Sequence, residues 1–362
     1  MGVPTIRGRL GAPPLGRLSP GEVDALRLVF RGSSVVDWFR LHFSELDEVD
    51  AFLRVNEFEP EDGTDMERLE DLHCRAVEYL REHLGYRRLL PEITTPGDVR
   101  RLFLLASERQ KRKLRMQACM TLKVMHIVNY QEGHELLSRL PFSGAEVSIL
   151  LRAKVERVVR GLLERKFPVV DFAGNSKTND SILSKLLAKK DTQAARVLDK
   201  LRFRLVVDRT EDIPSLVMTL LDELVPFNYV VPNQSSNTLL EFDRLLQRAG
   251  NVDVTRVDKG SGLVNEAPEN GLGNPQNEFS GPSYRVVSFV SEVPVRVDPV
   301  LPLEGRTVER LGRLVFGTVE LQIVDQVSSE RNESGENRHA LYKARQRSRV
   351  KERLERGKRG PL

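Results

Sequence analysis

Cysteine is scarce in this sequence, and long apolar runs are missing. Its 362 residues include only Cys74 and Cys119, which excludes a disulfide framework and a cysteine-based zinc site. No apolar stretch approaches the roughly 18 residues that a membrane-spanning helix needs. Residues 1–18 are rich in Gly, Pro and Arg but lack the apolar segment of a secretory signal. These absences predict a protein of the reducing cytosol that does not enter the membrane.

Aromatic residues are also few, at 6% of the chain, whereas charged residues reach 30%. The 40% hydrophobic share is ordinary for a globular protein, and the length allows two domains. Residues 343–362 hold nine Lys or Arg and two Glu, a formal charge of +7 that leaves −3 for the rest of the chain. Residues 351–362 therefore form a basic tail, which is either a solvated end or a contact for RNA or another polyanion.

The pattern of apolar residues divides the chain into an all-helical part and a mixed part. We expect residues 1–17 to be disordered and residues 18–140 to form a helical domain, because helical spacing recurs there without strand-like alternation. Residues 143–350 alternate between helices and strands, with an insertion at 236–282. Residues 250–282 of this insertion are rich in Gly, Asn, Asp and Pro, which indicates a loop. The strands are predicted at 167–172, 201–208, 284–297 and within 311–325, and the helices at 143–165, 179–190 and 211–224. The predicted fold is therefore α+β, a mixed sheet flanked by helices.

One sequence block near the C-terminus carries candidate chemistry. Residues 319–323 read V-E-L-Q-I, a strand pattern that bears Glu320, and residues 333–343 follow with the spacing E-x-G-x-x-x-H-x-x-Y-K. His339 and Lys343 are four residues apart, so they share one face of the helix that this spacing predicts. A strand carboxylate beside such a helix is an arrangement that can hold a metal–nucleotide complex.

A second block lies upstream and has two parts. Residues 181–186 (S-I-L-S-K-L) indicate a helix, and residues 198–207 (L-D-K-L-R-F-R-L-V-V) indicate a strand that follows an aspartate. The charged residues of interest in and just before these parts are Lys177, Lys185, Asp199 and Arg204. Lysine and arginine bind phosphate oxygens, so Lys177, Lys185 and Arg204 are candidates for phosphate contacts, whereas any one such cation is most often a surface charge.

Taken in chain order, with the upstream block first, the two blocks resemble the synthetase domain of the RelA/SpoT-type alarmone synthetases. That family has R-P-K, S-I-x-x-K-M and D-L-R-G-V-R-I-I-V, and then E-V-Q-I followed by A-E-x-G-x-x-x-H-W-x-Y-K. The resemblance extends over about residues 145–350 and is interrupted once. It implies a divergent member with a nucleotidyltransferase-like fold, and the Mg²⁺-dependent transfer of pyrophosphate from ATP to the 3′-hydroxyl of a guanosine nucleotide, GDP or GTP.

The resemblance also implies a role for each matched residue. Asp199 and Glu320 would bind Mg²⁺ together and act in catalysis. The other matched side chains would bind phosphates or line the nucleotide pocket: Lys177, Lys185, Arg204, Tyr284, Glu333, His339 and Lys343. We expect the two acids to lie on adjacent strands. We also expect Lys177, Lys185 and Arg204 to converge on one cleft. The alternative is that the two acids pair with Arg202 and Arg204 and that the other cations are solvated.

Three features depart from the family's pattern. Asn175 stands where the family has the Arg of R-P-K, and Arg202 replaces a small Gly. The acceptor-base motif G-Y-x-S-x-H is missing, and if the strand near Tyr284 is its counterpart, Ser288 stands in place of the His. The insertion lies where that motif belongs, so we expect residues 250–282 to overlie the acceptor side of the cleft.

Two other functions remain open on these residues. The acceptor is an RNA 3′ end if the basic tail and a second basic cluster at 109–115 bind nucleic acid. The chain is a non-catalytic nucleotide-sensing module if Asn175 and the missing acceptor motif abolish transfer. The presence of both Asp199 and Glu320 favours an enzyme, because a binding module need not keep both acids. We therefore expect a nucleotide pyrophosphokinase that uses ATP and Mg²⁺.

Overall fold

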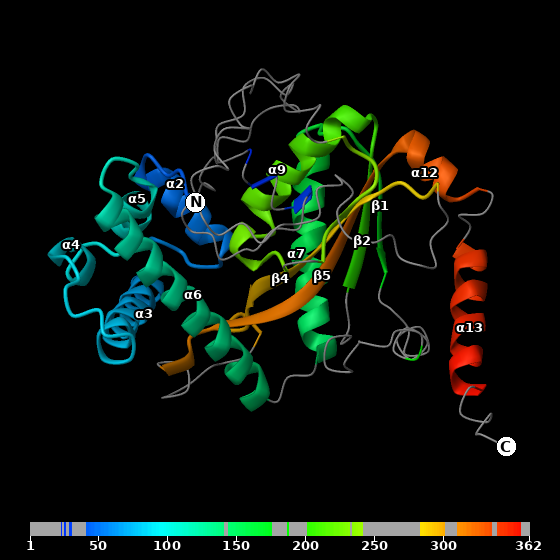
Figure 1. Cartoon of the computed structure of the whole chain (residues 1–362). Coiled ribbons are helices and arrows are strands. Elements are labelled where there is room, and N and C mark those ends of the chain that lie inside the picture. The colour runs from blue at the N-terminus through cyan, green and yellow to red at the C-terminus, as the bar shows by residue number, and fades with distance from the viewer. Residues whose placement is uncertain are drawn as a thin grey trace.

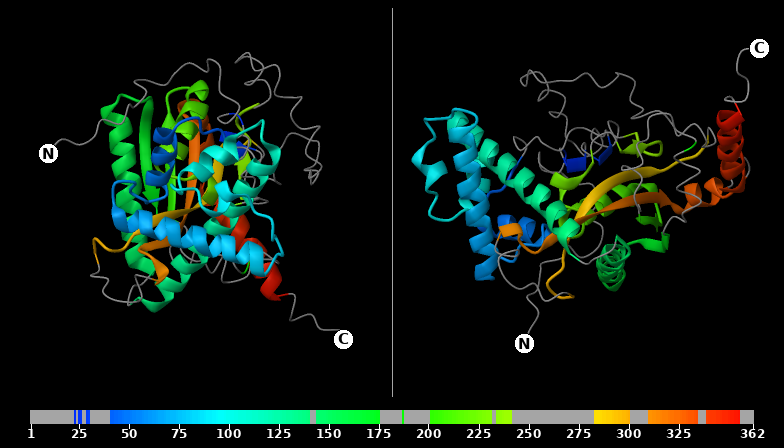
Figure 2. Two further views of the ribbon diagram at one scale, coloured as in Figure 1. Left: turned by 90° about the vertical axis from the view of Figure 1, so that its left-hand side faces the viewer. Right: turned by 90° about the horizontal axis from the view of Figure 1, so that it is seen from below.

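The computed structural model describes residues 23, 25–26, 29–30, 41–140, 144–175, 187, 201–231, 234–241, 283–300, 310–334 and 339–355. Within the last range, residues 339–342 and 353 are described by their backbone alone. The described chain runs from a group of helices, through a five-stranded sheet, to a helix at the opposite end of that sheet (Figure 1, Figure 2).

Helices alone make up the regular structure of residues 41–140. They are α2 (Leu46–Val55), α3 (Gly63–Glu82), α4 (Pro91–Thr94), α5 (Arg101–Ser107) and α6 (Arg112–Arg139). α3 begins where the Asp62 carboxylate accepts a hydrogen bond from the Thr64 amide at 2.8 Å, which satisfies one of the N–H groups exposed at a helix start. Leu69, Leu72 and Ala76 recur at helical spacing on α3 and lie in a buried cluster with side chains of α6.

The sheet has the strand order β1-β2-β5-β4-β3. Its strands are β1 (Val169–Asn175), β2 (Leu201–Val207), β3 (Ser236–Asn237), β4 (Val287–Arg296) and β5 (Leu314–Asp325). β2 and β5 run parallel, whereas the other neighbouring pairs run antiparallel. A mixed sheet with helices beside it confirms the α+β fold predicted from the sequence (Figure 1).

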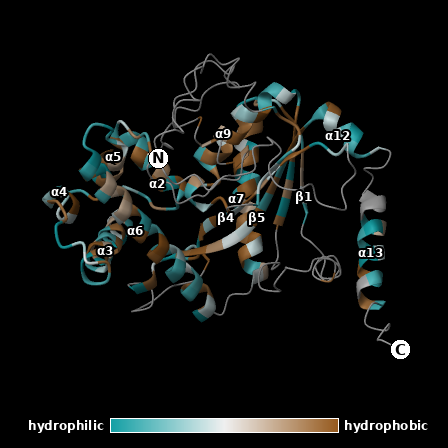
Figure 3. Cartoon of the chain, viewed as in Figure 1, coloured by the Kyte–Doolittle hydropathy of each residue, from teal (hydrophilic) through white to brown (hydrophobic). Residues whose placement is uncertain are grey.

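Further helices flank this sheet. They are α7 (Gly144–Glu164), α9 (Ile213–Glu223), α12 (Gln326–Asn332) and α13 (His339–Glu355), with the short 3-10 helices η3 (Thr210–Asp212) and η4 (Phe227–Tyr229). α7 and α9 pack on the sheet face that carries Phe203, Phe289 and Leu321, all fully buried. Hydrophobic residues predominate in α9, whereas hydrophilic residues predominate in α13 (Figure 3). None of the described helices is both long and apolar enough to cross a lipid bilayer.

Two glycines let helices approach β5 closely from opposite sides. A Cβ atom at Gly317 would overlap the side chain of Leu151 on α7, and a Cβ atom at Gly133 of α6 would overlap the ring of Phe316. Any larger residue at either position would push the helix away from the strand. α6 thus packs at the Phe316 end of the second sheet face, which is the face opposite α7 and α9. The middle of this second face carries polar side chains of β2 and β5.

Charged pairs join the helical part to the sheet. Lys154 of α7 is buried, donates a hydrogen bond to the Pro294 carbonyl at 2.9 Å and pairs with Glu57 at 2.5 Å. Burial lowers the pKa of Lys154, and Glu57 opposes that shift. Arg296 at the end of β4 pairs with Asp65 of α3 at 2.5 Å. Because a buried charge is costly without its partner, these pairs define how the helices sit on the sheet.

His126 of α6 lies in the same contact region, against η4. Its Nδ1 atom is 3.2 Å from Nδ2 of Asn228, and its ring packs on Tyr229 with the ring centroids 4.6 Å apart. Asn228 also donates a hydrogen bond to Asn56 Oδ1 at 3.0 Å, which links this ring to the chain after α2. Burial lowers the pKa of His126 to about 4, so the imidazole is neutral in the folded protein at neutral pH.

We expect His126 to make the folded state less stable as the pH falls. The unfolded chain takes up a proton on this side chain near its ordinary pKa of 6.5, whereas the folded protein does so only near 4. Stability is therefore lost as the pH falls from about 6.5 to about 4, by roughly 2–3 kcal/mol in the free energy of unfolding. Urea unfolding of the wild type and of His126→Gln, at about pH 7 and about pH 4.5, measures this loss.

The variant should lack most of the acid-dependent loss. His83→Gln is the matched control, because His83 is an exposed histidine and its removal should leave the loss intact. Equal acid-dependent losses in the wild type and in His126→Gln would show that another group is responsible.

Candidate functional site

β2 and β5 present their polar side chains on the same face of the sheet. The parallel register places Arg202 opposite Glu320 and Arg204 opposite Gln322. Because alternate residues of a strand point to opposite faces, these four side chains share the face that α7 and α9 leave uncovered. Asn175 of β1 lies opposite Arg202 on the other side of β2. We call the surface formed by Arg202, Arg204, Glu320 and Gln322 the polar face.

Glu320 lies at the centre of the polar face and is held by its neighbours. Its Oε2 atom is 3.1 Å from Nη2 of Arg202, and its Oε1 atom accepts a hydrogen bond from Nε2 of Gln322 at 3.1 Å. The Glu320 side chain is 13% exposed and that of Arg202 is 37% exposed. The carboxylate is thus screened from water and carries a guanidinium beside it.

Arg204 connects the polar face to α12. Its Nη2 atom donates to Ser329 Oγ at 2.9 Å, and its Nη1 atom pairs with Glu333 at 3.0 Å. α12 is placed there because it follows β5 directly and begins at Asp325, whose carboxylate accepts a hydrogen bond from the Ser328 amide at 2.9 Å. The carboxyl end of β5 therefore determines which residues meet Arg204.

α13 brings a third cation, Lys343, toward Arg202. The pKa of Lys343 is lowered, first by partial burial and then by the positive charges of Arg202 and Arg347. The positive charge of Arg202 therefore acts on Lys343 across the space between β2 and α13. His339 opens α13, and its side chain lies outside the described residues.

Three of the residues predicted to form the site lie outside the described residues. These are Asp199, Lys177 and Lys185. The predicted adjacency of Asp199 and Glu320, and the predicted cleft around the two lysines and Arg204, therefore stay predictions. Residues 250–282, predicted to overlie the acceptor side, lie outside the described residues as well.

Tyr284 lies at one end of the second sheet face, where it packs against an apolar cluster. Its partners in this cluster are Val206, Val286 and Val324, from the ends of β2 and β5 and the start of β4. Its carbonyl accepts a hydrogen bond from Thr238 Oγ1 at 3.1 Å. These contacts give the ring a packing role, and the predicted stacking on a base stays a prediction.

Two polar residues of this region were not found from the sequence. Gln322 follows Glu320 by two positions, and this spacing in a strand is the signal that places both side chains on one face. Ser329 carries no comparable signal, because its contact with Arg204 depends on how α12 lies against β2.

Among the described residues, the polar face carries a single carboxylate, Glu320, whereas Mg²⁺ takes several oxygen ligands. Arg202 and Gln322 each donate to one of its oxygens at 3.1 Å. Across the described part of the chain, no group of three or more His, Cys, Asp or Glu side chains is placed to hold a metal ion. This set of donors fits an anion, and phosphate above all.

Comparisons with known proteins give only distant structural likenesses. No protein-family model matches the sequence, and no curated protein matches it. The small alarmone synthetase 1 of Bacillus subtilis, solved with its product pppGpp, is 14% identical over 58% of this chain and 90% of its own, with a TM-score of 0.30. A GTP pyrophosphokinase family protein of Streptococcus pneumoniae is 12% identical over 58% of this chain and 84% of its own, with a TM-score of 0.28. At such TM-scores the likenesses carry no argument about this site.

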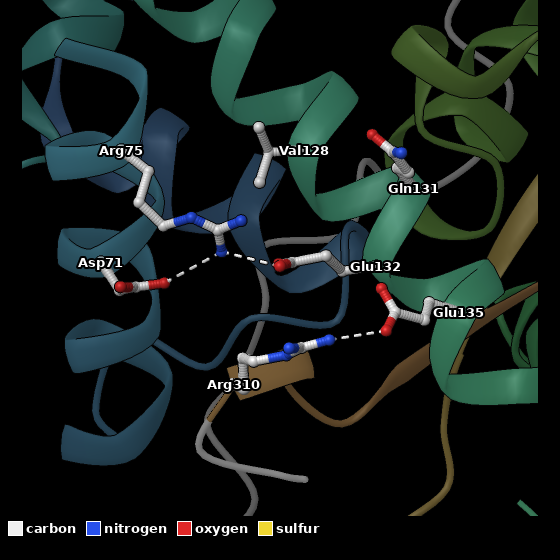
Figure 4. A pocket seen from close by; sticks show the side chains of 7 residues that line it. All are labelled: Asp71, Arg75, Val128, Gln131, Glu132, Glu135 and Arg310. Atoms are coloured by element: carbon white, nitrogen blue, oxygen red, sulfur yellow. Dashed lines mark hydrogen bonds and ion pairs between the residues drawn. The ribbon is translucent and has the colours of Figure 1, made fainter. Parts of the chain in front are cut away.

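A cavity of about 790 Å³ lies elsewhere, between α3 and α6. It is lined by Asp71, Arg75, Val128, Gln131, Glu132, Glu135 and Arg310 (Figure 4). Arg75 points between Asp71 and Glu132 and pairs with Glu132 at 2.7 Å, while Arg310 pairs with Glu135 at 2.6 Å (Figure 4). Its two arginines are both paired with acidic residues of the lining, and none of the predicted site residues lines it. We therefore take the polar face, and not this cavity, as the candidate site.

Glu132 should contribute strongly to stability. Its side chain is 9% exposed and pairs with Arg68, which is equally buried, at 2.5 Å and with Arg75 at 2.7 Å. Glu132→Ala would leave the Arg68 charge buried without this carboxylate, so we expect a loss of about 3 kcal/mol in the free energy of unfolding. Urea unfolding measures this loss.

Glu135→Ala is the matched control for Glu132→Ala. It lies on the same helix, is 35% exposed and pairs with the exposed Arg310 and Arg139. Surface ion pairs contribute about 1 kcal/mol or less, so this variant should lose little stability. Equal losses in the two variants would contradict the proposed importance of burial.

Proposed function

We propose that the polar face binds the polyphosphate chain of a nucleotide. The observation that carries this proposal is that Arg202 and Arg204 share one face of β2, with Arg202 beside the carboxylate of Glu320 and Arg204 beside Ser329 and Glu333. The positive charge of Arg202 also acts on Lys343 of α13. Guanidinium groups offer paired N–H donors that match phosphate oxygens, and lysine adds a compact positive charge. A di- or triphosphate offers several charged oxygens to these donors.

The contacts of Arg204 allow it to take up such a ligand. Its carboxylate partner Glu333 is exposed at the end of α12. Exposed ion pairs contribute about 1 kcal/mol or less, so a phosphate group can replace Glu333 at low cost. Ser329, the other partner of Arg204, keeps the guanidinium oriented toward the same end of the sheet.

The reaction that we propose at this face is the transfer of pyrophosphate from ATP to the 3′-hydroxyl of GDP or GTP. The 3′-oxygen attacks the β-phosphorus of ATP, the bond from that phosphorus to the oxygen bridging the α-phosphate breaks, and AMP leaves. The hydroxyl proton passes to a carboxylate, for which Glu320 is the described candidate. Arg202, Arg204 and Lys343 hold the phosphates in position and offset the charge on their oxygens. The order of the sequence blocks around Asp199 and Glu320, which resembles RelA/SpoT-type synthetases, supports this choice.

A nucleotide-binding module without catalysis is the second candidate. The Arg202–Glu320 ion pair favours it, because a carboxylate stabilised by a guanidinium is a weaker proton acceptor. Ser288 of β4, which lies opposite Gln322, also lacks a ring that could hold an acceptor base. Both candidates use the same phosphate contacts, and they differ only in whether pyrophosphate is transferred to an acceptor hydroxyl.

Labelled ATP distinguishes the two candidates. Purified protein is incubated with [γ-³²P]ATP, Mg²⁺ and GDP, GTP or bulk tRNA in separate reactions, and we expect label on the guanosine nucleotide. Glu320→Gln should lower the transfer rate by about 100-fold or more, as expected for loss of a proton acceptor. Arg204→Ala should weaken ATP binding by about 10-fold, since a hydrogen bond to a charged group is lost. Arg209→Ala is the control, because that side chain is 76% exposed near the end of β2.

Each alternative outcome has a definite meaning. Label on tRNA would make an RNA 3′ end the acceptor, and ATP binding without any label would favour the non-catalytic module. Asp199→Asn in the same assay tests the metal role predicted for Asp199, and unchanged transfer would show that role to be wrong. A wild-type protein that binds no nucleotide at all would contradict the proposal.

A further inference from the structure

Aromatic and apolar side chains are exposed where α3 ends. Tyr79, Leu84 and Tyr86 are all exposed to solvent within eight positions of the chain. The ring of His83, one helical turn after Tyr79, packs on the Tyr79 ring with the centroids 5.2 Å apart. Apolar residues that lie singly on a surface are normal, whereas a group of them indicates a binding site. The end of α3 is therefore a candidate for contact with a partner.

The chain turns at Gly85, which keeps Tyr86 close to the last turn of α3. Gly85 has a φ of +70°, a conformation that a residue with a Cβ atom rarely adopts, so the helix ends here. The amide of Tyr86 then donates a hydrogen bond to the carbonyl of Leu80 at 2.9 Å. Because this bond reaches back into the helix, Tyr86 follows directly on the helical turn that carries Tyr79 and His83.

Gln117 joins the segment after Tyr86 to α6. The Gln117 side chain is buried, and its Oε1 atom accepts a hydrogen bond from the Leu90 amide at 2.9 Å. Its Nε2 atom donates to the Arg88 carbonyl at 3.1 Å. Lys113 lies one helical turn before Gln117 on the same face of α6, so it is next to this segment. The end of α3 and the start of α6 thus form one surface, at the end of the molecule away from α13 (Figure 1, Figure 2).

The exposed residues of 79–90 and 109–116, which we call the α3–α6 surface, are rich in cations. Residues 83–91 and 109–115 hold seven Lys or Arg and no Asp or Glu, although residues 1–342 as a whole have a formal charge of −3. The acids that flank these segments in the sequence are fewer: Glu78, Glu82, Glu92 and Glu108. Five of the cations are exposed and pair with no acidic side chain of the described chain: Arg87, Arg88, Lys111, Arg112 and Lys113. The surface therefore attracts a polyanion.

Exposed rings beside unpaired cations match a single strand of nucleic acid. The bases of a single strand stack on tyrosine and histidine rings, and each phosphate offers a negative charge to lysine or arginine. A duplex has the same phosphates but keeps its bases inside, so it would use the cations alone. An apolar protein partner would use the rings and leave the positive charge unbalanced. Among these ligands, the single strand alone uses both kinds of side chain.

We propose that the α3–α6 surface binds single-stranded nucleic acid. The rings of Tyr79 and Tyr86 stack on bases, and the cations of Arg87, Arg88 and Lys113 contact the phosphates between them. The hydrogen bonds that fix residues 83–90 hold the rings and cations in place before a ligand arrives. This inference gives the helical part a function of its own and does not depend on nucleotide binding at the polar face.

Fluorescence anisotropy of the full-length protein with a labelled strand of about 12 nucleotides tests the inference. Separate titrations use the RNA strand, the DNA strand of the same sequence and the RNA duplex, at about 50 mM and about 200 mM salt. We expect either single strand to bind more tightly than the duplex, and the tighter of the two identifies the ligand. Affinity should fall steeply with salt, because phosphate contacts release counterions. No binding, or tighter binding of the duplex, would overturn the inference.

Two kinds of variant separate the rings from the cations. Tyr86→Ala should weaken binding by about 10-fold or more at both salt concentrations, since a stacked base is lost. Tyr86→Phe keeps the ring and should bind as the wild type does. Arg87→Ala combined with Arg88→Ala should reduce the slope of log affinity against log salt by about 1.4, which is about 0.7 for each lost phosphate contact. Arg160→Ala combined with Arg209→Ala removes the same charge from exposed positions elsewhere and should leave the slope unchanged.

These variants also separate the α3–α6 surface from the basic tail. If Tyr86→Ala and the paired arginine variant both bind the strand as the wild type does, the strand is held elsewhere and the inference is wrong. A wild type that binds no strand but sediments as a dimer, which Tyr86→Ala dissociates, would make a second copy of the chain the partner instead. Arg204→Ala should bind the strand normally, so this test is independent of the proposed nucleotide site. Circular dichroism should show the wild-type fold in every variant, because the substituted side chains of the α3–α6 surface are exposed.

Discussion

The parallel register of β2 on β5 is the constraint on which the candidate site depends. It sets Arg202 directly opposite Glu320 and Arg204 directly opposite Gln322. Because side chains alternate along a strand, a shift of β2 by one residue would turn Arg202 and Arg204 into the apolar layer under α7 and α9. β5 cannot shift alone, since it also pairs with β4 from Leu314 to Ile323. The polar face is therefore as well defined as the sheet itself.

The energy that maintains this register comes from the opposite side of the sheet. Phe203, Phe289 and Leu321 are fully buried there, and burial of each contributes about 1.5–3 kcal/mol. The partly exposed Arg202–Glu320 pair contributes about 1 kcal/mol or less. The apolar face thus determines the geometry, and the charges on the polar face are placed by it. Groups positioned in this way are available for a ligand without loss of the fold.

The balance of charge distinguishes the polar face from the cavity between α3 and α6. In the cavity, Arg75 and Arg310 each pair with a glutamate, so that neither arginine is left without an acidic partner (Figure 4). On the polar face, Arg202 pairs with Glu320 while staying 37% exposed, and the partner of Arg204, Glu333, is 69% exposed. Buried ion pairs stabilise a fold, whereas arginines that are partly exposed can exchange an exposed carboxylate for an anion from solution.

Local pattern was enough to predict the kinds of elements and several members of the site. The motif pattern at 198–207 and the strand-like segment within 311–325 predicted β2 and β5, and the motif spacing singled out Glu320, Arg204 and Lys343. Sequence reasoning also named Arg202 as a possible partner of the acids, but it did not establish the contact. Arg202 and Glu320 are 118 positions apart, and Arg204 and Ser329 are 125 apart. Periodicity acts within one strand or helix, whereas such pairings depend on which strands lie side by side and in which register, and only the packed sheet decides that.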